Sequence, residues 1–274
     1  MYGTIVPWEP KLQRYWLSLW RFWSTALASQ LEYQANVLID LLATGFSLVG
    51  SLFTLSLFFQ QQSSGLGGWT WEEALVVQGI YTAFDGMAST WLRPNLGAIV
   101  AYVREGTLDF VLLKPIDSQF WLSLRDLEPA GLPEMAFGLL LAAWAAAHAG
   151  AIFSPIALIT ALAMLIAGSI ILYSIWFLIA ATSIWFVKTW NATEVLRVLL
   201  ASGRYPVSAY PAALRLIFTL VLPVAFLTTV PAQMILGRTA VPMLLIGLGL
   251  AGVFFAIARL FWLYALRCYT SASS

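Results

Sequence analysis

The chain has 274 residues, of which 61% are hydrophobic and only 10% are charged, and its mean hydropathy is +0.83. Because water-soluble domains carry about 25% charged residues, we interpret the chain as an integral membrane protein. Its formal net charge of +1 and the lack of a basic run give no sign of nucleic-acid binding, and its single cysteine, Cys268, excludes an internal disulfide and multi-cysteine metal sites.

The first predicted element is an amphipathic helix over residues 11–30. Two sets of residues recur at helical spacing: Arg14, Ser18, Arg21 and Thr25, and then Trp16, Trp20, Trp23 and Leu27. The two sets are offset by two positions, which is about 200° around a helix, so they lie on opposite faces. A basic face opposite a tryptophan face predicts a helix lying in the membrane interface. The alternative is a soluble amphipathic helix.

Six apolar segments follow, and we predict that each spans the membrane. They are residues 36–59, 74–92, 133–149, 155–187, 216–236 and 241–266. The fourth is ambiguous, because residues 151–187 hold no charge and are far more than the ~20 residues that one crossing needs. This stretch is either one long tilted helix or a hairpin of two short ones. Proline is expected to break the fifth segment at Pro223 and to end it near Pro231.

The basic residues indicate how the spans are oriented. With six spans, most of them share one side of the membrane: Lys11, Arg14, Arg21, Arg93, Arg104, Lys114, Arg125, Lys188, Arg197, Arg204, Arg215 and Arg267. Arg238 lies on the other side, and Arg259 lies within the last span. The positive-inside rule then places both termini in the cytoplasm. A hairpin in the fourth segment would export residues 188–215, so we favour the single helix.

Residues 93–128 form the longest charged interruption and are assigned to water as a cytoplasmic region. Within them, residues 104–115 read Arg-Glu-Gly-Thr-Leu-Asp-Phe-Val-Leu-Leu-Lys-Pro. The glycine is typical of a helix end, the apolar core is too short to cross a membrane, and the Lys-Pro pair stops a helix. The pattern predicts a short helix at the membrane surface that contacts another protein. The alternative is an ordinary loop with its charges in water.

This stretch resembles the signature loop of ABC-2-type permeases, the transmembrane subunits of bacterial ABC exporters, and fits a six-span branch of that family. The residues that carry the resemblance are Arg104–Phe110 followed by Leu113-Lys114-Pro115. Further matches are Tyr205-Pro206, Tyr210-Pro211, Pro223–Phe226, Pro231-Ala232, Leu236-Gly237-Arg238, and Ala265–Arg267 with Tyr269. Cys268 is a departure, since the family usually has a second basic residue after the terminal arginine.

The resemblance implies an all-α integral membrane protein with one transmembrane domain over residues 1–274. It implies a dimer with a second permease, of the same or a sister chain, in which each half binds a cytoplasmic ABC ATPase. The ATPase is expected to dock on Arg104, Glu105, Gly106, Thr107, Leu108, Asp109, Phe110, Lys114 and Pro115. The chain has no Gly-x-x-x-x-Gly-Lys-Ser/Thr phosphate loop, so we expect no cofactor on this chain, and ATP and Mg²⁺ on the partner ATPase.

Charged residues inside apolar spans are usually functional, which makes Asp40 and Asp85 candidates for a translocation path. Asp40 has an alternative role near the cytoplasmic end of its helix, where it reaches water. Arg259 is a candidate counter-ion, and Glu134 fits the first turn of a helix, where the dipole favours a carboxylate. The prolines of the fifth span are expected to shape an outer gate. The predicted path therefore consists of Asp85, Asp40, Pro223 and Pro231.

Two further patterns point away from catalysis. His148 is the only histidine, which excludes a zinc site built on a histidine pair. Gly247-x-Gly249-x-x-Gly252 matches a dinucleotide-binding fingerprint, but it lies in an apolar span with no preceding strand. Close packing of helices through small residues is the better interpretation.

The leading hypothesis is an ABC exporter permease, not itself an enzyme, in the bacterial cytoplasmic membrane. Its substrate would be hydrophobic or amphipathic, such as a lipid, a drug-like compound or a glycan-linked lipid. One alternative is a membrane enzyme acting on lipid, which would need a cluster formed from Asp40, Asp85, Glu134 and His148. The other is a non-transporting scaffold that binds a cytoplasmic partner through residues 93–128.

Overall fold

The computed structural model of the chain describes residues 11–31, 34–61, 66–152, 154–186, 190–239 and 241–269, and these ranges contain helices, turns and loops but no β-strand. The helices are α1 (Lys11–Leu31), α2 (Gln34–Gln61), α3 (Trp71–Met87), α4 (Arg93–Arg104), α5 (Leu108–Leu112), α6 (Ser118–Leu124), α7 (Leu132–His148), α8 (Pro155–Ala181), α9 (Trp190–Leu200), α10 (Ala212–Leu216), α11 (Val224–Leu227), α12 (Thr229–Ile235) and α13 (Val241–Cys268).

Four of the described helical segments are long and apolar enough to cross a membrane. They are Leu42–Gln60, Pro129–His148, Pro155–Ile184 and Val241–Cys268. A fifth results if Ala212–Val221 and Val224–Ile235, which meet at an angle of 69°, are taken as one bent span. The predicted second span, residues 74–92, is not among them. Its helix α3 is short and carries Glu72, Glu73 and Asp85.

The long uncharged stretch that begins at residue 151 forms one helix. Ser154 caps α8 by accepting a hydrogen bond from the amide of Ala157, and Pro155 occupies the first turn, where a missing N–H costs nothing. The helix continues through a 3-10 turn to Ile184 without reversing direction. The structure therefore contains a single long helix here and no hairpin.

Helix α3 lies at the centre of the bundle. It continues through a π-helical turn (Ala88–Leu92) directly into α4, and most of its side chains are buried. It runs antiparallel to α7 at very short range: a Cβ built on Gly79 would lie 2.5 Å from the backbone N of Ala142, and one on Gly138 would lie 2.6 Å from the carbonyl O of Gly79. Glycine is therefore required at this contact, as is common where membrane helices pack closely.

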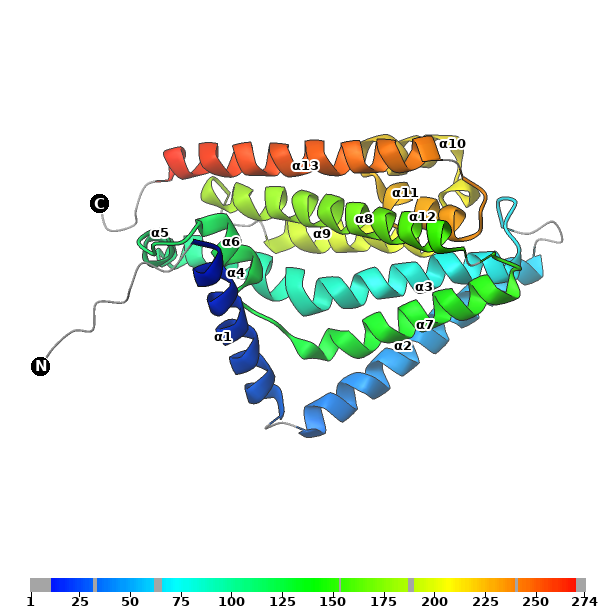
Figure 1. Cartoon of the computed structure of the whole chain (residues 1–274), viewed down its shortest axis with the longest axis horizontal. Helices are drawn as coiled ribbons and strands as arrows, with labels where there is room; N and C mark the ends of the chain where they lie inside the picture. The colour runs from blue at the N-terminus through cyan, green and yellow to red at the C-terminus, as the bar shows by residue number, and fades with distance from the viewer. Residues whose placement is uncertain are drawn as a thin grey trace, which may run out of the picture.

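The two ends of the bundle differ. One end holds α5, α6 and the last turns of α8 and α13 (Figure 1). At the other end, the turn before α3 meets the segment before α10. There the indole Nε1 of Trp69 donates to the Oγ of Ser208 (3.0 Å), and this hydroxyl donates to the carbonyl O of Gly67 (3.0 Å). Arg238 pairs with Glu73 at the same end.

The position of residues 190–215 differs from the sequence prediction, which placed residues 188–215 beside residues 93–128. Helix α9 begins near α4, and the chain then runs toward the opposite end, where Ser208 lies (Figure 1). Two arginines on this route contact protein groups. Arg204 lies over the ring of Tyr81 at 5.0 Å, and Arg215 donates to the carbonyl O of Ser208 (2.9 Å). The sequence prediction counted the basic residues on each side of the membrane and assumed that each of them faces cytoplasmic water.

The segment after α10 contains the predicted break. The backbone becomes extended at Leu222, directly before Pro223, and α11 then begins in a new direction. Pro231 does not end a helix, contrary to prediction. It lies in the first turn of α12, where an N–H would have no partner in the helix, and α12 runs on to Ile235 before Gly237 adopts a positive φ of +67°.

Candidate functional site

Helix α5 and the following Leu113 lie at one end of the bundle and form a segment that we call the α5 tip (Figure 1). The two faces of this segment differ. Helix α4 ends in a left-handed turn at Gly106 (φ +68°), with the amide of Thr107 donating to the carbonyl O of Tyr102 at 2.9 Å. One face of α5 is anchored, because Leu108 and Val111 are buried. The opposite face carries Phe110, which is 68% exposed, and Leu113 just beyond the helix, which is 80% exposed.

The predicted docking residues divide accordingly. Arg104, Glu105, Phe110, Lys114 and Pro115 are exposed, Gly106, Thr107 and Asp109 are partly buried, and Leu108 lies in the core. Leu108 is therefore an anchor for the tip and is not on its surface. A large exposed apolar pair surrounded by charges is typical of a protein contact site.

Cation–π contacts join the tip to α6. The Lys114 ammonium lies 5.3 Å from the ring centroid of Trp121, and the Arg125 guanidinium lies 4.6 Å from the same ring. Arg125 also donates to the hydroxyl of Tyr102 in α4. These contacts connect α4, α5 and α6, so we expect the three helices to move as one body.

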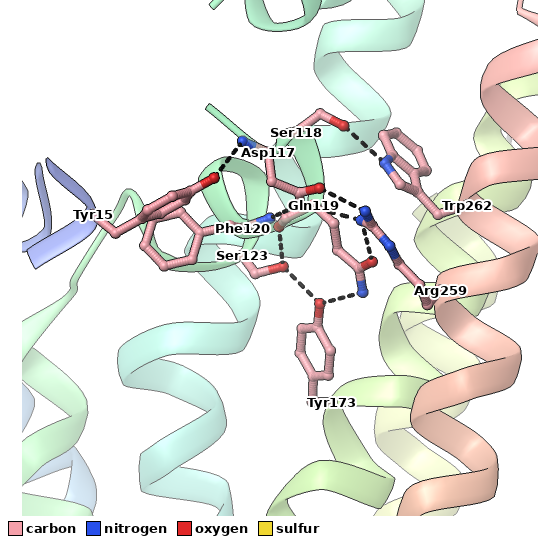
Figure 2. A network of polar contacts seen from close by, with 9 residues as sticks. All are labelled: Tyr15, Asp117, Ser118, Gln119, Phe120, Ser123, Tyr173, Arg259 and Trp262. Atoms are coloured by element: carbon pink, nitrogen blue, oxygen red, sulfur yellow. Dashed lines mark hydrogen bonds and ion pairs between the residues drawn. The ribbon is translucent and has the colours of Figure 1, made fainter. Parts of the chain in front are cut away.

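The start of α6 is bound to the last long helix, α13 (Figure 2). The Arg259 guanidinium donates to both carboxylate oxygens of Asp117, at 3.1 and 2.7 Å, and to the Oε1 of Gln119 at 3.1 Å. One turn away, the indole Nε1 of Trp262 donates to the Oγ of Ser118 at 3.1 Å. Asp117 also caps α6, since its Oδ1 accepts from the amide of Phe120 at 3.0 Å.

The same short helix also contacts α8 and α1. The Nε2 of Gln119 donates to the hydroxyl of Tyr173 (3.0 Å), which also shares a hydrogen bond with Ser123 (2.8 Å). On the other side, the Tyr15 hydroxyl accepts from the amide of Asp117 (3.3 Å), and its ring meets Phe120 edge-on. Helix α6 is thus held between α1, α8 and α13, an arrangement that we call the α6 clamp (Figure 2).

The charge of Asp117 is stabilised within the clamp. Partial burial raises the pKa of this carboxyl, but the hydrogen bonds from Arg259 and from the amides of Phe120 and Gln119 outweigh it, and the net pKa lies below its ordinary value. Asp117 is therefore ionised at neutral pH, and the Arg259 pair is intact there.

The described residues of the predicted path are distributed over α3 and the segment that contains α11 and α12. Asp85 pairs with Arg93 and lines a cavity of about 30 Å³ together with Tyr81, Arg197 and Thr228. Such a volume holds one or two waters and no lipid. The side chain of Asp40 lies outside the described residues, and Pro231 is buried within α12. Arg259 is bound to Asp117 instead of to an aspartate inside a span.

The structure separates His148 from Asp85 and Glu134, two other candidate residues of the enzyme alternative. His148 lies at the far end of α7, where its Nδ1 is 2.8 Å from the carbonyl O of Trp144 in the same helix. Asp85 is held by Arg93. Among the residues that the structure describes, no group of three histidine, cysteine, aspartate or glutamate side chains is arranged to hold a metal ion.

Sequence reasoning missed most of the α6 clamp. Asp117, Gln119 and Tyr173 follow no motif that the sequence analysis identified. One signal was present, namely Arg259 itself: an arginine within an apolar helix needs a partner. The sequence could not indicate which residue this partner is, because Asp117 is far away along the chain.

The comparison with protein families agrees with this architecture. A family model described as "ABC-2 family transporter protein" matches residues 46–273, which is most of the chain. No curated protein and no solved structure shows a significant match. The helical bundle, the apolar spans and this match identify the chain as a member of the ABC-2 transporter family.

Proposed function

We propose that this chain is the permease subunit of an ATP-driven exporter that moves a hydrophobic or amphipathic substrate across the bacterial cytoplasmic membrane. ATP and Mg²⁺ would bind to a separate ABC ATPase. The observation that carries the proposal is the α5 tip: an exposed apolar pair, Phe110 and Leu113, stands on a body that the α6 clamp ties to α8 and α13. A push on this tip would reach two long helices directly.

Six crossings fit the arrangement of the bundle. Helices α2, α3–α4, α7, α8, α9 and α13 run in alternating directions, and the broken segment α10–α12 lies at the end away from α5 (Figure 1). In this assignment α3 is a crossing buried within the bundle, which relieves it of the need to be apolar all round, and α9 is a crossing whose charged pair, Glu194 and Arg197, stays partly exposed.

The distribution of basic residues supports a cytoplasmic position for the α5 end. That end carries Lys11, Arg14, Arg21, Arg104, Lys114, Arg125 and Arg267, whereas Arg215 and Arg238 lie at the other. By the positive-inside rule the α5 end faces the cytoplasm. The cavity beside Asp85 is too small for a lipid, so a substrate path between two permease subunits fits better than one past Asp85.

The proposed orientation in the membrane predicts which residues a membrane-impermeant reagent can label from outside the cell. Cys268 is exposed at the α5 end, and Ala212 is exposed at the other. We expect a membrane-impermeant maleimide to label Cys268 only after cells are permeabilised, and to label Ala212→Cys, in a Cys268→Ser background, on intact spheroplasts. Labelling of residue 212 only after permeabilisation would instead restore the cytoplasmic assignment of residues 188–215.

The proposed contact between this chain and an ABC ATPase, which we call the motor partnership, is tested by co-purification. The Phe110→Ser/Leu113→Ser variant removes two exposed apolar side chains from the α5 tip, each worth about 1–2 kcal/mol if they are anchors of the contact. We expect recovery of an ABC ATPase, identified by mass spectrometry, with the wild-type permease and at least about a tenfold lower recovery with the variant.

The matched control is Ile152→Ser, which removes a similarly exposed aliphatic residue (84%) at the opposite end. It should recover the ATPase as well as the wild type does. Equal recovery with the double variant would place the docking site elsewhere. If no ATPase accompanies the wild-type chain, the exporter proposal fails and the scaffold hypothesis is favoured.

A further inference from the structure

Helix α1 lies across the end of the bundle at which α5 and α6 lie, while the long helices run away from it (Figure 1). Its exposed face carries Trp16 (68% exposed) and Trp20 (65%), which lie one helical turn apart. Toward the bundle, Trp23 Nε1 donates to the carbonyl O of Leu124 at 3.2 Å, and Tyr15 contacts α6. The orientation and the exposed tryptophans fit a helix at the membrane surface.

A cleft of about 510 Å³ opens between α1 and the segment that follows α6. Arg21 and Thr25 line it from α1, and Arg125 and Asp126 line it from the other side. Asp126 lies 3.6 Å from Arg125 and partly offsets its charge. Arg21 has no acidic partner among the residues that the structure describes, so the lining carries a net positive charge of one.

The chemistry of this lining favours one class of ligand. Guanidinium groups bind phosphate oxygens in a bidentate manner, and the volume lies in the range of small-ligand sites. With the orientation of the proposed function, the cleft lies at the headgroup level of the cytoplasmic leaflet, which is rich in anionic lipid. We propose that the cleft binds the phosphate group of an anionic phospholipid, held by Arg21 and Arg125, while its acyl chains lie beside Trp16 and Trp20.

Such a lipid would also act on the α6 clamp. Arg125 directly follows α6 and lies over Trp121, so a phosphate shared by Arg125 and Arg21 would add a third contact between α1 and α6, after those of Tyr15 and Trp23. This inference rests on the membrane orientation of the proposed function and does not require the ATPase contact.

The test is native mass spectrometry of the purified chain in detergent with added phosphatidylglycerol or phosphatidylcholine. We expect phosphatidylglycerol to bind more tightly, and Arg21→Gln to weaken its binding about fivefold, the effect of one arginine near a lipid surface. Arg21→Lys keeps the charge and should retain most of the binding. Arg267→Gln removes a different exposed arginine at the same end and should leave the binding unchanged.

Competition with inorganic phosphate distinguishes a lipid headgroup from free phosphate as the ligand of the cleft. It should not displace phosphatidylglycerol at an equal concentration, and displacement would identify a site for free phosphate instead of lipid. Equal binding of both lipids to the wild type, or an undiminished preference in Arg21→Gln, would overturn the proposal. Neither result depends on ATPase recovery, so this inference and the motor partnership can fail separately.

Discussion

Gly138→Ala should prevent stable assembly of the bundle. A Cβ at this position would lie 2.6 Å from the carbonyl O of Gly79 and 2.8 Å from the Cα of Ala83, and both are backbone atoms that cannot rotate away. Helices α3 and α7 would have to separate. Because lipid is as apolar as the side chains between membrane helices, close packing supplies much of the association energy. We expect a loss of about 3 kcal/mol or more.

The measurement is the yield of monodisperse protein in detergent and its midpoint of thermal unfolding. We expect the yield of Gly138→Ala to fall to about a tenth of the wild-type yield or less. Gly249→Ala and Gly252→Ala are matched controls, since a Cβ at either position has no neighbour within 4 Å. They should be neutral or gain up to about 1 kcal/mol from the higher helix propensity of alanine. Equal yields for Gly138→Ala and these controls would show that α3 and α7 do not approach so closely.

The glycines show where sequence reasoning stops. The pattern at Gly247, Gly249 and Gly252 predicted close helix packing, yet only Gly247 faces a neighbour, the flexible side chain of Met164. The tight backbone contacts between α3 and α7 occur at Gly79 and Gly86 on α3, at Gly131 directly before α7 and at Gly138 on α7, and the two glycines on each side are seven residues apart. Whether a glycine contacts a neighbouring helix depends on which face of its own helix points toward that neighbour. This orientation cannot be inferred from a single sequence.

Local signals were sufficient to predict a helix within residues 104–115. Charges between apolar segments, a glycine at a helix end and a Lys-Pro stop predicted a short helix within residues 104–115, and the structure has α5 there. Family membership followed from the same residues and is confirmed. The attachment of this region could not be predicted, because the α6 clamp joins side chains from α1, α6, α8 and α13 that come together only in the folded bundle.

Helix α9 shows a second limit. Hydropathy identifies helices that face lipid, but α9 carries Glu194 and Arg197, which pair with each other at 2.9 Å, and Arg204 follows it in the interior against Tyr81. Val195 and Val198 on the same helix are exposed, so its surface mixes charged and apolar side chains. The sequence therefore indicated an aqueous loop, and the fifth span was assigned to the bent segment after it.

The bond between Arg259 and Asp117 should determine whether force on the α5 tip reaches α13. Asp117→Asn is the informative change at one end, because asparagine caps a helix as well as aspartate does but removes the charge that holds Arg259. Arg259→Lys is its counterpart, because lysine keeps the charge but cannot bridge both oxygens of Asp117 and Gln119. Both side chains are about one third exposed, so each change should cost only about 1–2 kcal/mol of local stability.

We expect these variants to fold and to recover the ATPase, while hydrogen exchange at the amides of Ser118–Leu124 becomes about tenfold faster. ATP hydrolysis by the reconstituted permease–ATPase complex should fall by a similar factor, since the tip would move without α13. Arg267→Gln, which removes an arginine from the end of α13 outside the clamp, should change neither quantity. If exchange at α6 increases in both variants while hydrolysis stays at the wild-type rate, the clamp has a structural role only, and the motor acts on the bundle through Tyr173 and α8.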